Sequence, residues 1–246
     1  MSRAKQYLAT ALLAALLGAS AARGLAGGDE LRAIVQEQCL PHWLEARDPA
    51  PCVRVGADPD GDEAPVFALL HDRKGGAHYL LIPVRTVRGI DEREVLGAAA
   101  PNYFAAAWLG RTVLADATGR ALPRSAVGMA INPLRARSQD QLHIHIECLR
   151  PGVYRGLKQA ADALHDTWSQ IRIDGADYQA LRVSGADLGA NPFALIAHGV
   201  PGSMNRYSLL VAGMEFRDGP GFAVLVQTEG VPAGELLLDS SCAVTQ

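Results

Sequence analysis

The segment QLHIHIECL, residues 141–149, alternates polar and aliphatic side chains, and this alternation constrains the fold more than any other feature of the sequence. Successive side chains of a β-strand point to opposite faces, so His143, His145 and Glu147 share one face of a predicted strand. The opposite face consists of Leu142, Ile144, Ile146 and Cys148. We expect the aliphatic face to pack into a core and the ionisable face to line a cleft. A solvated sheet face is the simplest alternative.

The rest of the chain predicts helices interleaved with antiparallel strands. Apolar periodicity and capping signals predict helices at 29–40, 102–119, 156–170 and 191–201. Aliphatic runs between turn residues predict further strands at 64–72, 77–85, 126–132, 178–183, 207–216 and 221–227. We therefore predict an α+β fold, an antiparallel sheet with flanking helices. Its parts would be a leader (1–28), a half that carries the histidines (29–150) and a C-terminal half (151–246) compatible with a degenerate internal repeat.

Charge and the N-terminus narrow the classes of partner. The 246-residue chain has a net charge of -3 and no basic block, so it lacks the electrostatic footprint of a nucleic-acid-binding protein. Arg3 and Lys5 precede an uncharged apolar run at 7–22 that contains an Ala-Ser-Ala site at 19–21. This layout is typical of a secretory signal peptide, and it also allows an uncleaved N-terminal membrane anchor. We expect the body of the chain to be exported.

The four cysteines fit an exported chain, with neither a CxxC pair nor zinc-ligand spacing. They are Cys39, Cys52, Cys148 and Cys242. An even number favours disulfides, and four cysteines allow three connectivities. Free buried thiols are the alternative. We favour Cys39–Cys52, which closes the short segment LPHWLEARDPAP, and this choice leaves Cys148–Cys242.

Two kinds of chemistry fit the ionisable face of the predicted histidine strand. The side chains of His143, His145 and Glu147 offer ligands for iron or zinc, although an i, i+2 pair on a strand is a weak metal motif. Alternatively, a neutral imidazole attacks phosphorus and water then releases the covalent intermediate. Asn132 on the preceding strand would orient the nucleophile or the phosphate, and Gln139 is a candidate phosphate donor.

These residues also carry a resemblance. HIHIE, with Asn132 eleven positions before His143 and Gln139 four before it, resembles the His-φ-His-φ-His motif of the histidine-triad nucleotide hydrolases and transferases. Upstream, His71 and Asp72 followed by HYLLIPVR (78–85) resemble the HD…HFLVIPK hairpin of that superfamily. The fuller pattern is a leader, QCLP, PC, AIN, RSQDQLHIHIECLRP and a cysteine near the C-terminus. It resembles the bacterial CDP-diacylglycerol pyrophosphatases along essentially the whole chain.

The resemblance implies hydrolysis of CDP-diacylglycerol to CMP and phosphatidate without a cofactor, at the periplasmic face of the inner membrane. His145 matches the nucleophile, which would carry a transient CMP, and His143 matches the histidine that orients it. Asp72 matches the acidic residue that holds the ribose hydroxyls, and His78 is expected among the substrate-binding residues.

Glu147 departs from the motif, because the third histidine would stand there. An ionised carboxylate repels phosphate, so we expect either that Glu147 is protonated or that the phosphatidate leaving group needs no acid. Three alternatives remain open: transfer of CMP to an acceptor other than water, a metal-dependent hydrolase that uses His143, His145 and Glu147, and a non-catalytic nucleotide or lipid binder. We also allow for a homodimer.

Overall fold

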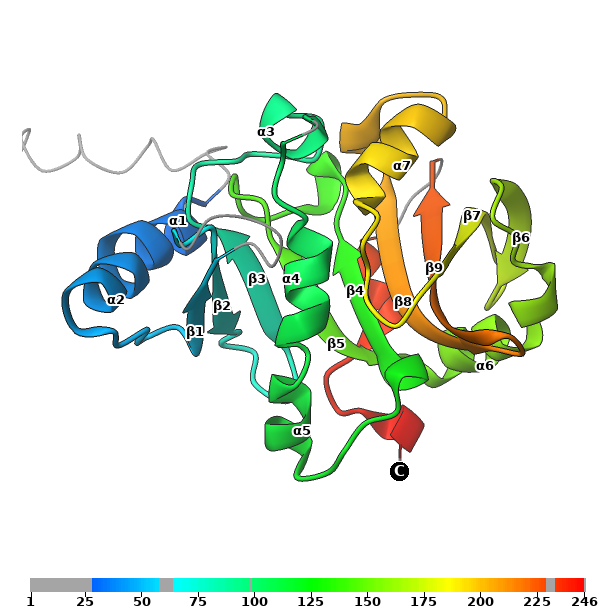
Figure 1. The fold of residues 1–246 in the computed structure, drawn as a ribbon, viewed down its shortest axis with the longest axis horizontal. Coiled ribbons are helices and arrows are strands. Elements are labelled where there is room, and N and C mark those ends of the chain that lie inside the picture. The colour runs from blue at the N-terminus through cyan, green and yellow to red at the C-terminus, as the bar shows by residue number, and fades with distance from the viewer. Residues whose placement is uncertain (1–27, 58–63, 98, 229–232, 246) are drawn as a thin grey trace, which may run out of the picture.

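A single antiparallel sheet organises the chain (Figure 1). The computed structural model describes residues 28–57, 64–97, 99–228 and 233–245, so residues 1–27 of the predicted leader lie outside it. Ten strands pair antiparallel throughout the described part, and helices cover the sheet, which confirms the predicted α+β class. No helix within the described ranges is long and apolar enough to cross a membrane.

The strands are β1 (Arg54–Gly56), β2 (Phe67–His71), β3 (Tyr79–Pro83), β4 (Val127–Ile131), β5 (Ile144–Leu149), β6 (Ser169–Ile173), β7 (Ala176–Ser184), β8 (Ser208–Phe216), β9 (Gly219–Gln227) and β10 (Leu238–Asp239). The α-helices are α1 (Glu30–Ile34), α2 (Leu40–Ala46), α3 (Arg93–Leu96), α4 (Tyr103–Gly110), α5 (Val113–Thr118), α6 (Pro151–Gln159) and α7 (Pro192–Gly199). A π-helical turn at Val35–Cys39 joins α1 to α2, and short 3₁₀ turns include Leu134–Ala136 and Gly234–Leu237.

The sheet runs in the order β1-β2-β3-β5-β4-β8-β9-β7-β6, and β10 pairs with the end of β5. Strand β5 therefore contacts three neighbours, β3, β4 and β10. In this register, His145 stands directly between Leu80 of β3 and Ala130 of β4. The pairing of β4 with β8 continues the sheet from the first half of the chain into the second.

Apolar side chains cover both faces of the sheet. One face packs beneath α4 and α7 in the main core, which includes the even-numbered residues Leu142, Ile144, Ile146 and Cys148 of the histidine segment. The other face carries two separate clusters, one beneath α1 and the other beneath α6. Leu80 belongs to the cluster beneath α1, and Ala130 belongs to the cluster beneath α6. The polar side chains of β5 therefore lie where these two clusters meet.

Three predicted helices differ from the structure. The helix expected at 102–119 is interrupted at residues 111–112, where the N–H of Arg111 donates to the carbonyl oxygen three residues back, and it therefore forms two helices, α4 and α5. The helix expected to end at Leu40 continues to Ala46, because the π-helical turn at Val35–Cys39 widens the backbone just before Pro41. The helix expected at 156–170 instead begins at Pro151 and ends at Gln159, and its last predicted residues belong to β6. In β6, the buried residues Ile171 and Ile173 alternate with exposed residues, which is the pattern of a strand that was not predicted from the sequence.

Both disulfides join the cysteine pairs favoured from the sequence. Cys39–Cys52 links the π-helical turn to the segment before β1, with a Cα–Cα distance of 5.6 Å. Cys148–Cys242 links β5 to the C-terminal segment, with a Cα–Cα distance of 5.1 Å. All four cysteines are buried. The second bond therefore ties the C-terminus to the strand that carries His145.

Removing either disulfide would destabilise the fold by an amount that follows the length of the loop it closes. The loops span 94 residues for Cys148–Cys242 and 13 residues for Cys39–Cys52. Paired alanine substitutions are expected to lower the free energy of unfolding by about 4 to 5 kcal/mol for the long loop and about 3 kcal/mol for the short one. Urea denaturation of the two double variants would measure both losses, and an equal or reversed order would contradict the loop-entropy explanation.

Candidate active site

The ionisable face of β5 opens into a cavity of about 410 Å³. Helix α1, the β2–β3 hairpin, the segment before β5 and the C-terminal 3₁₀ turn surround it. Its apolar wall is formed by Leu31, Ile34, Leu70 and Leu80. Its polar lining is formed by Glu30, His71, Asp72, Arg73, Lys74, Asn132, Ser138, Gln139, His143, His145 and Glu235. One cavity thus combines an apolar wall with the predicted catalytic histidines.

The contacts of Asn132 orient the ring of His145. The backbone N–H of Glu235 donates to Asn132 Oδ1 over 3.1 Å, so the amide group of Asn132 turns its Nδ2 toward His145. Asn132 Nδ2 lies 3.4 Å from His145 Nε2. Because an amide NH₂ group donates, Nε2 of a neutral His145 is the nitrogen with the lone pair, and its proton resides on Nδ1. Nε2 is the nitrogen that a nucleophilic histidine would use here.

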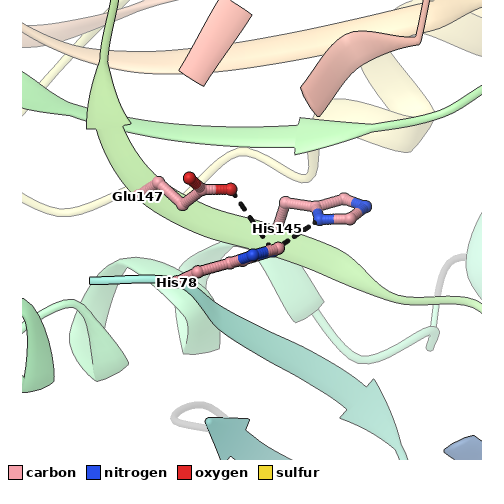
Figure 2. Close-up of side chains that lie close together, drawn as sticks. All are labelled: His78, His145 and Glu147. Atoms are coloured by element: carbon pink, nitrogen blue, oxygen red, sulfur yellow. Dashed lines mark hydrogen bonds and ion pairs between the residues drawn. The ribbon is translucent and has the colours of Figure 1, made fainter. Parts of the chain in front are cut away.

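A second histidine and Glu147 lie behind His145 (Figure 2). His145 Nδ1 lies 3.0 Å from His78 Nε2, and Glu147 Oε1 lies 3.3 Å from the same His78 nitrogen. On its other side, His78 Nδ1 lies 3.9 Å from Asp72 Oδ1. All three residues shown in Figure 2 are buried, and His78 reaches the cluster from the start of β3. The β3–β5 register therefore places a histidine next to His145 from a neighbouring strand.

Burial keeps this cluster uncharged at neutral pH. Burial lowers the pKa of His145 well below its ordinary value, and the neighbouring His143, His78 and Lys74 lower it further. Burial is also the main cause that lowers the pKa values of His78 and His143. For Glu147, burial first and the nearby Glu235 second raise the pKa to about 8. The carboxyl group is therefore mostly neutral at pH 7, the first of the two alternatives expected from the sequence.

The other residues singled out from the sequence occupy distinct places. His143 Nδ1 donates to the carbonyl oxygen of Gln141 over 2.8 Å, and its ring stands edge-on to His145 with centroids 5.0 Å apart. Gln139 lines the cavity, and its Oε1 accepts from the N–H of Leu31 over 3.2 Å. Asp72 lines the cavity from the end of β2. The fold thus gathers these predicted residues around one space.

Two of the charged residues that line the cavity, Glu235 and Lys74, act on His145 and were not among the predicted site residues. Glu235 approaches from the C-terminal 3₁₀ turn, and its Oε2 lies 3.5 Å from His145 Nδ1 and 3.4 Å from Lys74 Nζ. Lys74 lies in the β2–β3 turn, where it was read only as part of the hairpin signal. Because Glu235 lies far along the chain from the histidine strand, only the tertiary contact identifies it.

Among the described residues, one set of three donor groups is compact enough to hold a metal ion. Their donor atoms lie within 4.8 Å of one another, and the set is His78, His145 and Glu147. This differs from the predicted set, because His78 takes the place of His143. A catalytic metal needs an open coordination position toward its substrate. Neither His78 nor Glu147 lines the cavity, so a metal here would lie behind His145 and the donor set fits a catalytic metal poorly.

Comparison with known proteins identifies the family of this chain. The antiparallel sheet and the cavity bring buried histidines together in one enclosed site, an arrangement typical of an enzyme. Residues 26–246 match the family model of CDP-diacylglycerol pyrophosphatase. A CDP-diacylglycerol pyrophosphatase of Yersinia pestis is 35% identical over 253 residues, which cover 98% of this chain and 95% of that protein. The chain belongs to the CDP-diacylglycerol pyrophosphatase family, whose members are hydrolases of a diphosphate bond.

The neutral carboxyl group of Glu147 gives folding a specific pH dependence. Its pKa rises from 4.5 to about 8 on folding, so its contribution to stability is full below about pH 4.5 and is lost as pH rises through 8. Glu147→Gln stays neutral at every pH. We expect this variant to exceed the wild type in free energy of unfolding by about 1 to 3 kcal/mol at pH 8.5, and to match it near pH 4.5.

Urea denaturation at both pH values would measure the difference. Glu94→Gln, at an exposed glutamate of α3, is the matched control and should track the wild type throughout. A stability difference between Glu147→Gln and the wild type that is the same at both pH values would show that folding does not raise the pKa of Glu147.

Proposed function

We propose that this protein hydrolyses CDP-diacylglycerol to CMP and phosphatidate through a transient CMP-histidine on His145. The observation that carries the proposal is the orientation of His145. Its Nε2 faces Asn132 at the cavity, and its Nδ1 faces His78 and Glu235. Burial keeps the ring neutral, so the nucleophilic lone pair is available at neutral pH. Family membership supports the substrate.

The reaction would proceed in two displacements at one phosphorus atom. First, His145 Nε2 attacks the phosphorus that bears cytidine, and the bond to the bridging oxygen breaks with its electron pair leaving on phosphatidate. The ring then carries a phosphorus on Nε2 and the original proton on Nδ1, so it bears a positive charge. Water next attacks the same phosphorus, the P–N bond returns its electron pair to Nε2, and the water proton is released to solvent. These steps consume one water and need neither oxidant nor reductant.

The composition of the cavity suits one half of such a substrate. Its volume of about 410 Å³ falls in the range for small-molecule sites, which favours the nucleotide half over two acyl chains. The apolar wall that includes Leu31 and Ile34 offers a surface for the cytosine ring, and Asp72 offers an acceptor for the ribose hydroxyls. Glu147 lies outside the lining and is neutral, so it does not repel the diphosphate.

The start of the described chain lies beside this cavity, which supports a membrane-facing orientation. The N–H of Gly28 donates to the carbonyl oxygen of Ser138 over 2.9 Å, and Ser138 lines the cavity. The predicted leader therefore joins the body next to the site. We propose that the leader directs the cavity toward the periplasmic face of the inner membrane, where the diacylglycerol part of the substrate stays in the bilayer.

A metal-dependent hydrolase remains a distinct second candidate, because the donor atoms of His78, His145 and Glu147 converge. Chelation separates the two mechanisms. For the covalent mechanism, release of CMP from CDP-diacylglycerol in detergent micelles should persist in excess EDTA. Loss of turnover in EDTA, restored by added metal, would support the metal-dependent mechanism.

Substitution of the nucleophile gives the second test. His145→Ala should reduce turnover by at least about 1,000-fold, because the covalent intermediate cannot form. His165→Ala, at an exposed histidine, is the matched control and should retain wild-type turnover.

Trapping of the covalent intermediate tests the same step directly. When a reaction with substrate labelled at the cytidine phosphate is quenched without acid, the label should remain bound to the wild-type protein and not to His145→Ala. Product analysis would reveal transfer if CMP esters form in place of CMP, and turnover by His145→Ala at the wild-type rate would exclude the covalent mechanism.

A further inference from the structure

We propose that Glu235 is a positioning residue that holds His145 for attack and balances the positive charge on its ring in the covalent intermediate. This inference rests on the proposed function and assigns a role in the reaction to the C-terminal segment. The histidine motif and the β2–β3 hairpin lie in the first half of the chain, whereas Glu235 lies near its end.

Glu235 contacts three parts of the site. Its Oε2 lies 3.5 Å from His145 Nδ1, the nitrogen that keeps its proton during attack. Its backbone N–H donates to Asn132 Oδ1 over 3.1 Å, which turns the other end of that amide toward His145 Nε2. Its carboxylate also lies 3.4 Å from Lys74 Nζ across the cavity. Through one side chain and one backbone group, Glu235 therefore acts on both nitrogens of His145.

The fold brings the backbone of Glu235 close to β4 and β5. A Cβ atom on Gly234 would lie 2.5 Å from the carbonyl oxygen of Ile131, so the glycine permits this close approach. Just beyond Glu235, β10 pairs with β5, with Leu238 opposite Leu149. The Cys148–Cys242 disulfide then fixes the same segment covalently to β5. The histidine strand and Glu235 are thus held in one rigid arrangement.

The charges around His145 explain why a carboxylate is needed there. His143, which directly precedes β5, and His78 and Lys74, from the β2–β3 hairpin, all disfavour a charged His145 ring. Glu147 on β5 is mostly neutral, and Asp72 faces His78 at 3.9 Å. Attack places a positive charge on the ring, with the remaining proton on Nδ1. His78 Nε2 lies 3.0 Å from Nδ1, and Glu235 presents a negative oxygen 3.5 Å from the same nitrogen, so its charge stabilises the intermediate more than the free enzyme.

Glu235→Gln tests this role because the amide keeps the shape and removes the charge. We expect kcat to fall by about 100-fold, the low end of what a positioned electrostatic group supplies, with KM within about threefold of the wild type. Both limbs of the pH profile of kcat/KM should move to lower pH. Glu235 lies 3.5 Å from His145, so removing its negative charge makes protonation of that ring harder and moves the acid limb to lower pH. Glu235 also raises the pKa of Glu147, so its removal lets Glu147 ionise at lower pH; that ionisation adds a negative charge close to His145, which we expect to cause the alkaline limb.

Lys74→Gln is the matched variant, because it removes a positive charge where Glu235→Gln removes a negative one. Lys74 lowers the pKa values of both His145 and Glu147, so its removal should move both limbs to higher pH. Glu235→Asp, which retains the charge, should keep both limbs near their wild-type positions even where kcat is reduced. Glu45→Gln, at an exposed glutamate of α2, should match the wild type in every parameter. A thermal unfolding scan of each variant checks that the fold is intact.

The outcomes separate this inference from the proposed function. A folded Glu235→Gln with wild-type kcat and an unshifted pH profile would overturn the positioning role, even where His145→Ala is inactive. A fall in kcat without any shift of the limbs would assign Glu235 a purely structural role and would also overturn it. An active His145→Ala variant would instead refute the covalent mechanism itself.

Discussion

Burial of neighbouring ionisable side chains is the constraint on which the site depends. His78, His145 and Glu147 share a space that is almost closed to solvent. Charged forms are costly there, so the imidazoles lose their protons and the carboxyl group keeps its own. The same burial that would destabilise a charged cluster thus leaves a neutral imidazole on His145, the proposed nucleophile, near a neutral carboxyl group.

The sheet supplies this burial without closing the cavity. The main core covers the aliphatic face of β5, whereas the opposite face is covered by two clusters that meet at the histidines. Helix α1 bounds one side of the resulting cavity and the C-terminal 3₁₀ turn bounds the other. Disulfide Cys148–Cys242 and the β10–β5 pairing hold that turn in place, so the two halves of the chain form a single site.

Local signals in the sequence were reliable where one periodicity dominated. Alternation across 141–149 predicted both faces of β5, and aliphatic runs between turn residues predicted β2 and β3. Asn191 and Pro192 predicted the start of α7, where the Asn191 side chain accepts from the N–H of Phe193. The predicted helix at 156–170 was wrong beyond Gln159, because its apolar stripe continues past the end of α6, whereas Ser169 and Gln170 pair with β7 as the start of β6.

The sequence by itself determined the class of fold, the aliphatic and polar faces of β5, the favoured cysteine pairing and the candidate nucleophile, because each follows from short-range spacing or from a local motif. Only the tertiary structure decided that His78, rather than His143, lies within hydrogen-bonding distance of His145 Nδ1, and that Glu147 is neutral. It alone revealed Glu235, since contacts across the sheet depend on strand register and burial. A pKa likewise depends on everything that surrounds a group, which no neighbouring stretch of sequence specifies.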